Sequence, residues 1–162
     1  MPQPEQPPDL SFVVPAANEN RWSDLLATLI STDPAPMKAL LAIDFDTVRR
    51  EVLLAVPGAR RADRLDFLLQ RGDRPAAVIE AKLLSDLGPG QLGRYLAAVP
   101  EAERHVVLHL ARLPVSVGGS QPWTSLTWET VLDAYASSAH PWVRTTATAW
   151  LSSLDSLVPP VG

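Results

Sequence analysis

The chain has no cysteine among its 162 residues, which excludes disulfide bridges, thiolate metal sites and a cysteine nucleophile. It also lacks any apolar run approaching the roughly 18–20 residues of a transmembrane helix. The first ten residues, MPQPEQPPDL, have neither the basic nor the apolar region of a secretory signal. We therefore expect a cytoplasmic protein without membrane contact.

Positive charge is scarce in the chain as a whole and nearly missing from its C-terminal third. The formal net charge is −4, which argues mildly against a protein that wraps nucleic acid non-specifically. Seven of the fourteen lysine and arginine residues lie between positions 49 and 74, and only Arg144 follows position 113. This distribution predicts that one half of the molecule faces phosphate groups. For any single arginine, a solvated position on a hairpin turn is the simpler interpretation.

Length and composition predict one globular domain. A chain of this length can bury about two-thirds of its unfolded surface, and contents of 46% hydrophobic and 20% charged residues are ordinary. Residues 1–16 are rich in proline and should form a disordered arm. We expect a single domain over 17–157, with a core over 17–112 and a helical extension over 113–157, followed by a tail over 158–162.

The first predicted element is a helix over 18–31, with Asn18 as its N-cap. Its apolar residues recur with the spacing of one helix face: Trp22, Leu25, Leu26, Leu29 and Ile30. Residues 32–37 (TDPAPM) should break this helix, and 38–46 should form a short helix or a turn.

The rest of the pattern predicts an α/β fold. The expected strands are 47–56, 65–70, 76–83 and 105–110, and the expected helices are 91–99, 128–137 and 141–157. Turn signals stand at Pro57-Gly58 and at Gly72-Asp73, and 114–126 reads as a connection. The predicted core is a helix, a three-stranded meander, a helix and a fourth strand reached by a crossover, with extra C-terminal helices.

Two carboxylates and a lysine gather on the predicted hairpin. Side chains alternate along a strand, so Glu80 and Lys82 point the same way, and Asp66 on the preceding strand can lie across from Glu80. Mg²⁺ prefers oxygen ligands, which the two carboxylates and the carbonyl of Ala81 could supply. Lys82 could then orient the attacking water or stabilise charge. A surface ion pair is the alternative, but charges in so apolar a strand (AAVIEAKLL) are costly, which favours a functional site.

The segment ADRLDF offers two aspartates for this site. Asp63 and Asp66 are three residues apart, so within one regular strand they face opposite sides and only one can meet Glu80. Asp63 lies among arginines at positions 60, 61 and 64, where a solvated ion pair is expected. The apolar run FLL begins directly after Asp66, so we predict that Asp66 is the ligand.

The helix predicted after the hairpin carries three polar residues on one face: Gln91, Arg94 and Tyr95. Gln91 could contact a metal-bound water or the phosphate, and Arg94 could contact the nucleic-acid backbone. For Tyr95, half-buried packing is as good an interpretation as a ligand role. Glu19 shares the apolar face of the first helix, where the helix dipole alone would also favour an acid.

Four segments in order resemble the PD-(D/E)XK nuclease superfamily, the fold of many restriction endonucleases and repair nucleases. They are Glu19 at the first helix, RLDFLL over 64–69, VIEAK over 78–82 and QLGRY over 91–95. The proline of the family name is absent, since Leu65 precedes Asp66, but that position varies within the superfamily. The resemblance covers roughly residues 17–112.

The resemblance implies a restriction-endonuclease-like core and a site that hydrolyses phosphodiesters with Mg²⁺ or Mn²⁺. Metal ligands would be Glu19, Asp66, Glu80 and the Ala81 carbonyl, and the catalytic residues would be Asp66, Glu80, Lys82 and Gln91. Nucleic acid would be contacted by Arg64, Arg94 and Tyr95.

Other polar and aromatic candidates are weaker. His105 and His109 share one strand face but lie roughly 13 Å apart, too far to chelate one metal, so we expect core or surface histidines. The run 117–120 (VGGS) lacks the context of a nucleotide loop or a serine elbow. Tryptophans 123, 128, 142 and 150 could stack bases, but packing of the C-terminal helices on the sheet is the favoured interpretation.

These observations predict a metal-dependent nuclease that hydrolyses DNA. One alternative is a catalytically silent protein that keeps the nuclease fold and binds a protein partner through its C-terminal helices. Another is an RNA-directed nuclease, which the same chemistry permits. A homodimer is left open.

Overall fold

The computed structural model describes residues 18–55, 58, 62–88, 90–115, 117 and 122–157. The predicted arm over 1–16 and tail over 158–162 lie outside the described residues, as do Pro57 of the predicted turn and most of 117–120. No described helix is long and apolar enough to cross a membrane.

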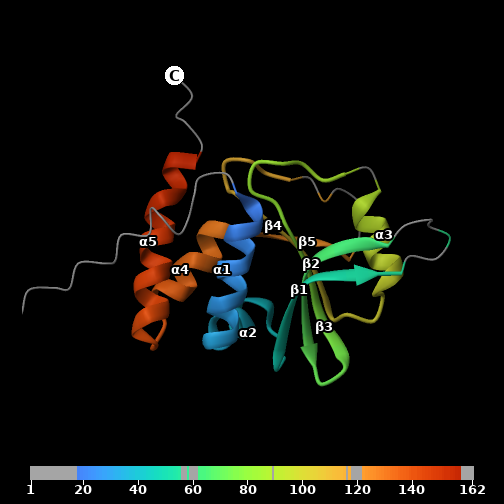
Figure 1. Cartoon of the computed structure of the whole chain (residues 1–162), viewed down its shortest axis with the longest axis horizontal. Helices are drawn as coiled ribbons and strands as arrows, with labels where there is room; N and C mark the ends of the chain where they lie inside the picture. Colours follow the sequence, from blue (N-terminus) through green and yellow to red (C-terminus); the bar gives the residue numbers. More distant parts are fainter. Residues whose placement is uncertain are drawn as a thin grey trace, which may run out of the picture.

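A mixed five-stranded sheet forms the centre of the molecule (Figure 1). Its strands, in spatial and sequence order, are β1 (Thr47–Leu54), β2 (Asp63–Arg71), β3 (Arg74–Ala81), β4 (Arg104–His109) and β5 (Thr124–Thr127). The first three form an antiparallel meander, whereas β4 is parallel to β3 and β5 is parallel to β4. The predicted α/β class is confirmed.

Strand β5 overlaps the end of the segment over 114–126 that we expected to be a connection. Its four residues, TSLT, are too few for a clear alternation, and they are exposed or only partly buried. Pairing with β4, in which Leu126 lies opposite Leu108, makes this segment a strand.

Five helices cover the two faces of the sheet. They are α1 (Glu19–Thr32), α2 (Ala35–Leu41), α3 (Gln91–Ala98), α4 (Trp128–Ala136) and α5 (Pro141–Leu157). Helix α3 lies on one face, and the other four lie on the opposite face (Figure 1). The predicted cap is confirmed, since the Asn18 side chain accepts a hydrogen bond from the Arg21 N–H. The break expected over 32–37 is shorter than predicted, because α2 begins at Ala35, with Pro34 as its N-cap and Pro36 in its first turn, where a missing N–H costs nothing.

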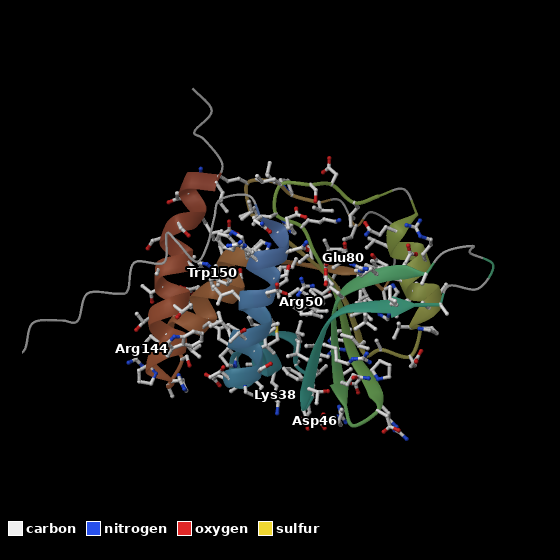
Figure 2. All side chains as sticks on the ribbon, viewed as in Figure 1. Lys38, Asp46, Arg50, Glu80, Arg144 and Trp150 are labelled. Carbon is white, nitrogen blue, oxygen red and sulfur yellow. The ribbon has the colours of Figure 1, made fainter. Side chains whose placement is uncertain are left out.

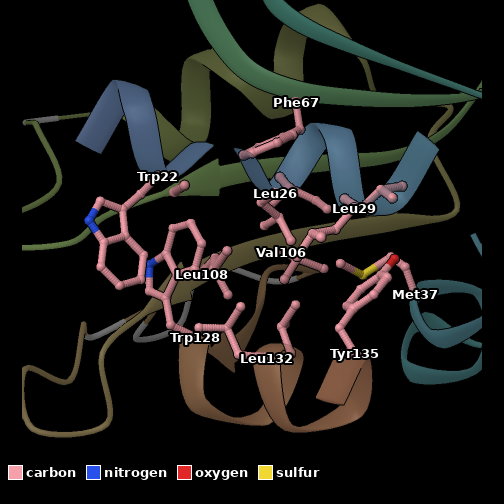
Figure 3. Packing of buried hydrophobic residues seen from close by; sticks show 14 of the residues in the cluster. Trp22, Leu26, Leu29, Met37, Phe67, Val106, Leu108, Trp128, Leu132 and Tyr135 are labelled. Atoms are coloured by element: carbon pink, nitrogen blue, oxygen red, sulfur yellow. The ribbon is translucent and has the colours of Figure 1, made fainter. Parts of the chain in front are cut away.

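The larger hydrophobic core lies between the sheet and the helices α1, α2, α4 and α5 (Figure 3). Trp22 of α1 stacks on Trp150 of α5 at 4.7 Å and meets the edge of Trp128 of α4 at 5.8 Å. The predicted packing is therefore confirmed for Trp128 and Trp150. Trp142 is 47% exposed, and Trp123 packs instead in the second core, beside α3.

The regular alternation of side chains breaks in the middle of the β1–β2 hairpin. Leu65 and Leu68 both pack in the α3 core although they are three residues apart, whereas Phe67 packs in the larger core. Across the hairpin, Glu51 has a φ of 52°, an uncommon conformation for a residue other than glycine. Asp66 lies at this irregular point, so simple strand alternation does not describe its surroundings.

Candidate active site

Asp66 of β2 and Glu80 of β3 lie side by side at the centre of the sheet. The antiparallel register, with Phe67 opposite Ile79, brings the two carboxyl groups together. Asp66 Oδ2 accepts a hydrogen bond of 2.9 Å from the N–H of Ala81. The two carboxyl groups interact, since, besides burial, the charge of Asp66 raises the pKa of Glu80. The structure thus brings together the two predicted carboxylates, and it leaves the ligand role of the Ala81 carbonyl a prediction.

The Glu80 carboxylate is buried and only half satisfied. Its side chain is 4% exposed, and Oε1 lies 3.1 Å from Lys82 Nζ and accepts a 3.0 Å bond from Gln91 Nε2. Oε2 is buried without a hydrogen-bond partner among the described residues. Burial, followed by the charge of Asp66, raises the pKa of Glu80 to about 8. A buried unpaired carboxylate oxygen is costly, so this position favours a proton or a cation.

Arg50 of β1 supports Asp66 from the side of the larger core. Arg50 Nη1 donates to the Asp66 carbonyl at 2.7 Å and lies 3.7 Å from Asp66 Oδ1, while its guanidinium stands 5.0 Å from the Phe67 ring. Figure 2 shows Arg50 and Glu80 together near the middle of the molecule. The pKa of Asp66 is raised, because burial outweighs the Ala81 N–H and the charges of Arg50 and Lys82, which lower it. By sequence Arg50 was only one of the basic residues between positions 49 and 74, although its place two residues from both Val48 and Val52 in a strand was a signal.

Gln91 and Tyr95 connect the site to helix α3. Gln91 Nε2 donates to the Tyr95 hydroxyl at 2.9 Å as well as to Glu80, and Gln91 Oε1 accepts from the Gly88 N–H. The Tyr95 hydroxyl donates to the Arg64 carbonyl at 2.9 Å. Gln91 is therefore held by three groups, which fixes its amide against Glu80.

The structure corrects the prediction that Tyr95 contacts nucleic acid. Its side chain is 2% exposed, because the α3 core surrounds the ring and the hydroxyl is bonded on both sides. Burial and the nearby Glu80 charge raise the pKa of Tyr95 to about 12, so the hydroxyl keeps its proton. Tyr95 positions Gln91.

Asp63 pairs with an arginine of helix α3, whereas Arg60 and Arg61, which precede it in sequence, lie outside the described residues. Its Oδ2 lies 2.7 Å from Arg94 Nε of α3, so Asp63 also faces the α3 side. Leu65, two residues further on, packs on the same side, as regular alternation requires. Asp66 lies where the alternation breaks, and the prediction that the two aspartates face opposite sides stays a prediction. Arg64 is exposed and lies 3.8 Å from Glu51. Contacts of Arg64 and Arg94 with nucleic acid stay predictions.

Glu19 occupies a different place from the two central carboxylates. Its Oε1 accepts bonds of 2.8, 3.1 and 3.1 Å from the N–H groups of Leu83, Leu84 and Ser85, and one of 2.7 Å from Ser85 Oγ. Burial raises the pKa of Glu19, but these hydrogen bonds outweigh it and the net pKa is lowered. The described residues contain no group of three or more acidic, histidine or cysteine side chains that could hold a metal. The metal role of Glu19 stays a prediction, and its observed contacts anchor residues 83–85 to α1.

Lys82 directly follows β3 and is held by its main chain. Its N–H donates to the Leu108 carbonyl at 2.7 Å, and its carbonyl accepts a bond of 3.0 Å from Trp128 Nε1. Its side chain is 14% exposed. The unsatisfied Oε2 of Glu80, with Asp66 beside it, is an oxygen donor set that fits a divalent cation completed by water.

The histidines pack in the core, as expected. His105 is 2% exposed, with Nε2 2.8 Å from the Val99 carbonyl and its ring 5.3 Å from Trp123. His109 is 7% exposed, with Nδ1 2.7 Å from the Leu110 carbonyl. The structure gives neither histidine a ligand role.

No protein-family model matches the chain, and no curated protein matches it in sequence. A crystal structure of a protein of unknown function, AF1548, aligns with 86% of this chain and 98% of its own, at 11% identity and a TM-score of 0.48. The DNA modification-dependent restriction endonuclease AspBHI aligns with 98% of this chain, at 14% identity and a TM-score of 0.33. The chain spans 45% of that enzyme's length. At these TM-scores neither likeness bears on the function.

Proposed function

We propose that the chain is a metal-dependent nuclease that hydrolyses phosphodiester bonds of DNA and uses Mg²⁺ or Mn²⁺. The observation that carries this proposal is the buried, unpartnered Oε2 of Glu80, beside a second carboxylate and a lysine. Buried carboxylates are kept in this unfavourable arrangement mainly where they perform chemistry.

The order of the elements supports a restriction-endonuclease-like core. Helix α1 is followed by the antiparallel strands β1, β2 and β3, and helix α3 then leads to β4, which is parallel to β3. This is the arrangement that the motifs around Asp66, Glu80 and Gln91 imply.

Each residue of the site would have a distinct task. A divalent cation, when bound, neutralises developing charge on the phosphate and lowers the pKa of a bound water. Asp66 and Glu80 would hold the cation, with Glu19 as a further candidate. Gln91 and Lys82 both hold Oε1 of Glu80, which leaves Oε2 for the ligand. The Lys82 ammonium would orient the attacking water or stabilise charge in the transition state.

Two alternatives differ in substrate or in chemistry. The site acts on the phosphodiester, so the same residues would also serve an RNA-directed nuclease. A catalytically silent interaction protein is favoured by one observation, the 47% exposure of Trp142 on α5, which leaves an aromatic surface for a protein partner.

The deciding experiment measures cleavage of plasmid DNA, single-stranded DNA and RNA, with Mn²⁺ and with EDTA. We expect cleavage only with the metal. Glu80→Ala should abolish metal binding in calorimetry. Lys82→Ala should retain binding but slow cleavage by roughly 10²–10⁴-fold, because it acts on the water and not on the ion. Unchanged cleavage in EDTA would contradict the mechanism.

Two neighbouring aspartates provide a matched comparison. Asp66→Ala should abolish cleavage, because Asp66 lies beside Glu80 and would supply the second carboxylate to the cation. Asp63→Ala should retain most activity, since Asp63 pairs with Arg94 at a partly exposed position. The reverse result would make Asp63 the metal ligand.

A further inference from the structure

A cavity of about 240 Å³ opens beside Lys82. Its walls are residues 82–86, which follow β3, together with His109 at the end of β4 and residues 112–115, which follow β4. Lys82 lines this cavity, and its Nζ lies 3.1 Å from Oε1 of Glu80. Whatever enters the cavity meets the same lysine that the proposed chemistry uses.

The cavity combines positive charge with exposed leucines. Lys82 and Arg112 both line it, against one acidic lining residue, Asp86. Leu84 is 45% exposed and Leu113 is 38% exposed, and both line the cavity. Only four large hydrophobic residues of the described chain are this exposed, so two of them stand at one small cavity. Cations for a phosphate and apolar surfaces for a base together match a nucleotide.

One wall of this cavity is held rigidly by hydrogen bonds from three elements. Glu19 of α1 accepts from the N–H groups of residues 83–85, and the main chain of Lys82 is bonded to β4 and α4. A wall fixed before binding loses little entropy when a ligand arrives. This wall of the cavity is therefore in place before a ligand binds.

The volume of the cavity suits a single nucleotide and is too small for a base pair. Pockets for drug-sized ligands span roughly 300–1,000 Å³, so this cavity holds a smaller group. A base in a duplex is paired and stacked on both sides, and it enters a closed pocket only after it leaves the stack. An unpaired base of a single strand needs no such step.

We propose that this cavity takes one unpaired nucleotide of the substrate, with its base between Leu84 and Leu113 and its phosphate facing Lys82 and Arg112. The inference rests on the proposed nuclease function for its link to cleavage. It makes the substrate a strand that is single-stranded at the cleavage site, such as a free single strand, an overhang or a flap.

The test measures binding separately from cleavage. A fluorescent oligothymidylate is titrated with the full chain in EDTA, and its anisotropy is recorded for the unchanged protein, for Leu84→Asp and for Leu53→Asp. Leu53 is a matched control, since it is also an exposed leucine but lies on β1, outside the cavity. Leu84→Asp should weaken binding by about tenfold, because it removes an apolar contact and adds a charge that repels phosphate. Leu53→Asp should change affinity by less than about twofold.

A second measurement compares cleavage of the single strand with cleavage of the same sequence in a blunt duplex. Faster cleavage of the single strand, reduced by Leu84→Asp, supports the inference. Metal-dependent cleavage that prefers the duplex and ignores Leu84→Asp would overturn the inference and leave the nuclease function intact. Binding that is lost on Leu84→Asp without any cleavage would support the nucleotide cavity and refute the nuclease. Equal weakening by both leucine variants would overturn the inference.

Discussion

At the scale of single residues, Glu80 is the least favourably placed carboxylate of the site. It is more deeply buried than Asp66 or Lys82, and its Oε2 has no partner among the described residues. Its neighbours are arranged to hold one oxygen and not the other. The residue is therefore expected to be protonated in the absence of metal near neutral pH.

Glu80→Gln should reveal this protonation through the melting temperature in EDTA. Because the pKa of Glu80 rises from 4.5 to about 8 on folding, its contribution to stability is fully present below pH 4.5 and is lost as pH rises through about 8. The neutral glutamine cannot show this loss. The melting temperature of Glu80→Gln minus that of the unchanged protein should rise by on the order of 5 °C between about pH 5 and about pH 9. Thermal unfolding followed by circular dichroism measures this difference. Parallel pH curves would show that Glu80 ionises normally.

At the scale of elements, the site depends on how α1 is joined to the segment after β3. One oxygen of Glu19 accepts three main-chain N–H bonds and a hydroxyl bond across a separation of 64 to 66 residues. This contact connects the first helix to the residues that follow Lys82. It also gives Glu19 a structural task that the metal interpretation did not include.

Glu19→Ala should lower the stability by about 1–3 kcal/mol, because it leaves N–H groups of residues 83–85 unpaired. Glu129→Ala is a matched control, since Glu129 also stands in the first turn of a helix but accepts from one N–H, that of Ala111. Urea unfolding should therefore show a larger loss for Glu19→Ala. Lost metal binding with unchanged stability would instead identify Glu19 as a metal ligand.

At the scale of the whole molecule, a metal that binds only the folded state should stabilise it by mass action. A concentration of about one hundred times Kd contributes about 2.7 kcal/mol, which raises the melting temperature of a domain of this size by roughly 5–10 °C. Millimolar Mn²⁺ should produce this shift in differential scanning fluorimetry. The shift should be larger at higher pH, since the cation competes with the proton of Glu80.

The control for this measurement is Glu80→Ala, which removes a ligand and should show no shift with Mn²⁺. An equal shift in the variant would place the cation elsewhere on the molecule. Ca²⁺ offers a further comparison, because it accepts oxygen ligands but tolerates a less regular geometry than Mg²⁺.

The sequence by itself determined the features that obey local rules. The Asn18 cap, the apolar face of α1 and the β2–β3 hairpin follow from spacing and turn chemistry within a few residues. Strand alternation predicted that Glu80 and Lys82 point to the same side. In the structure Glu80 contacts both Lys82 and Gln91. These interactions lie between neighbours in sequence or on adjacent strands, so periodicity was enough to predict them.

Only the tertiary structure decided the features that depend on distant residues. The partners of Glu19 lie 64 to 66 residues away, and the pairing with β4 that makes β5 a strand joins segments about eighteen residues apart. The burial of Tyr95, the support of Asp66 by Arg50 and the pairing of Asp63 with Arg94 arise where strands and helices pack. Such contacts depend on the packing of the whole core, and the local periodicity of the sequence does not predict them.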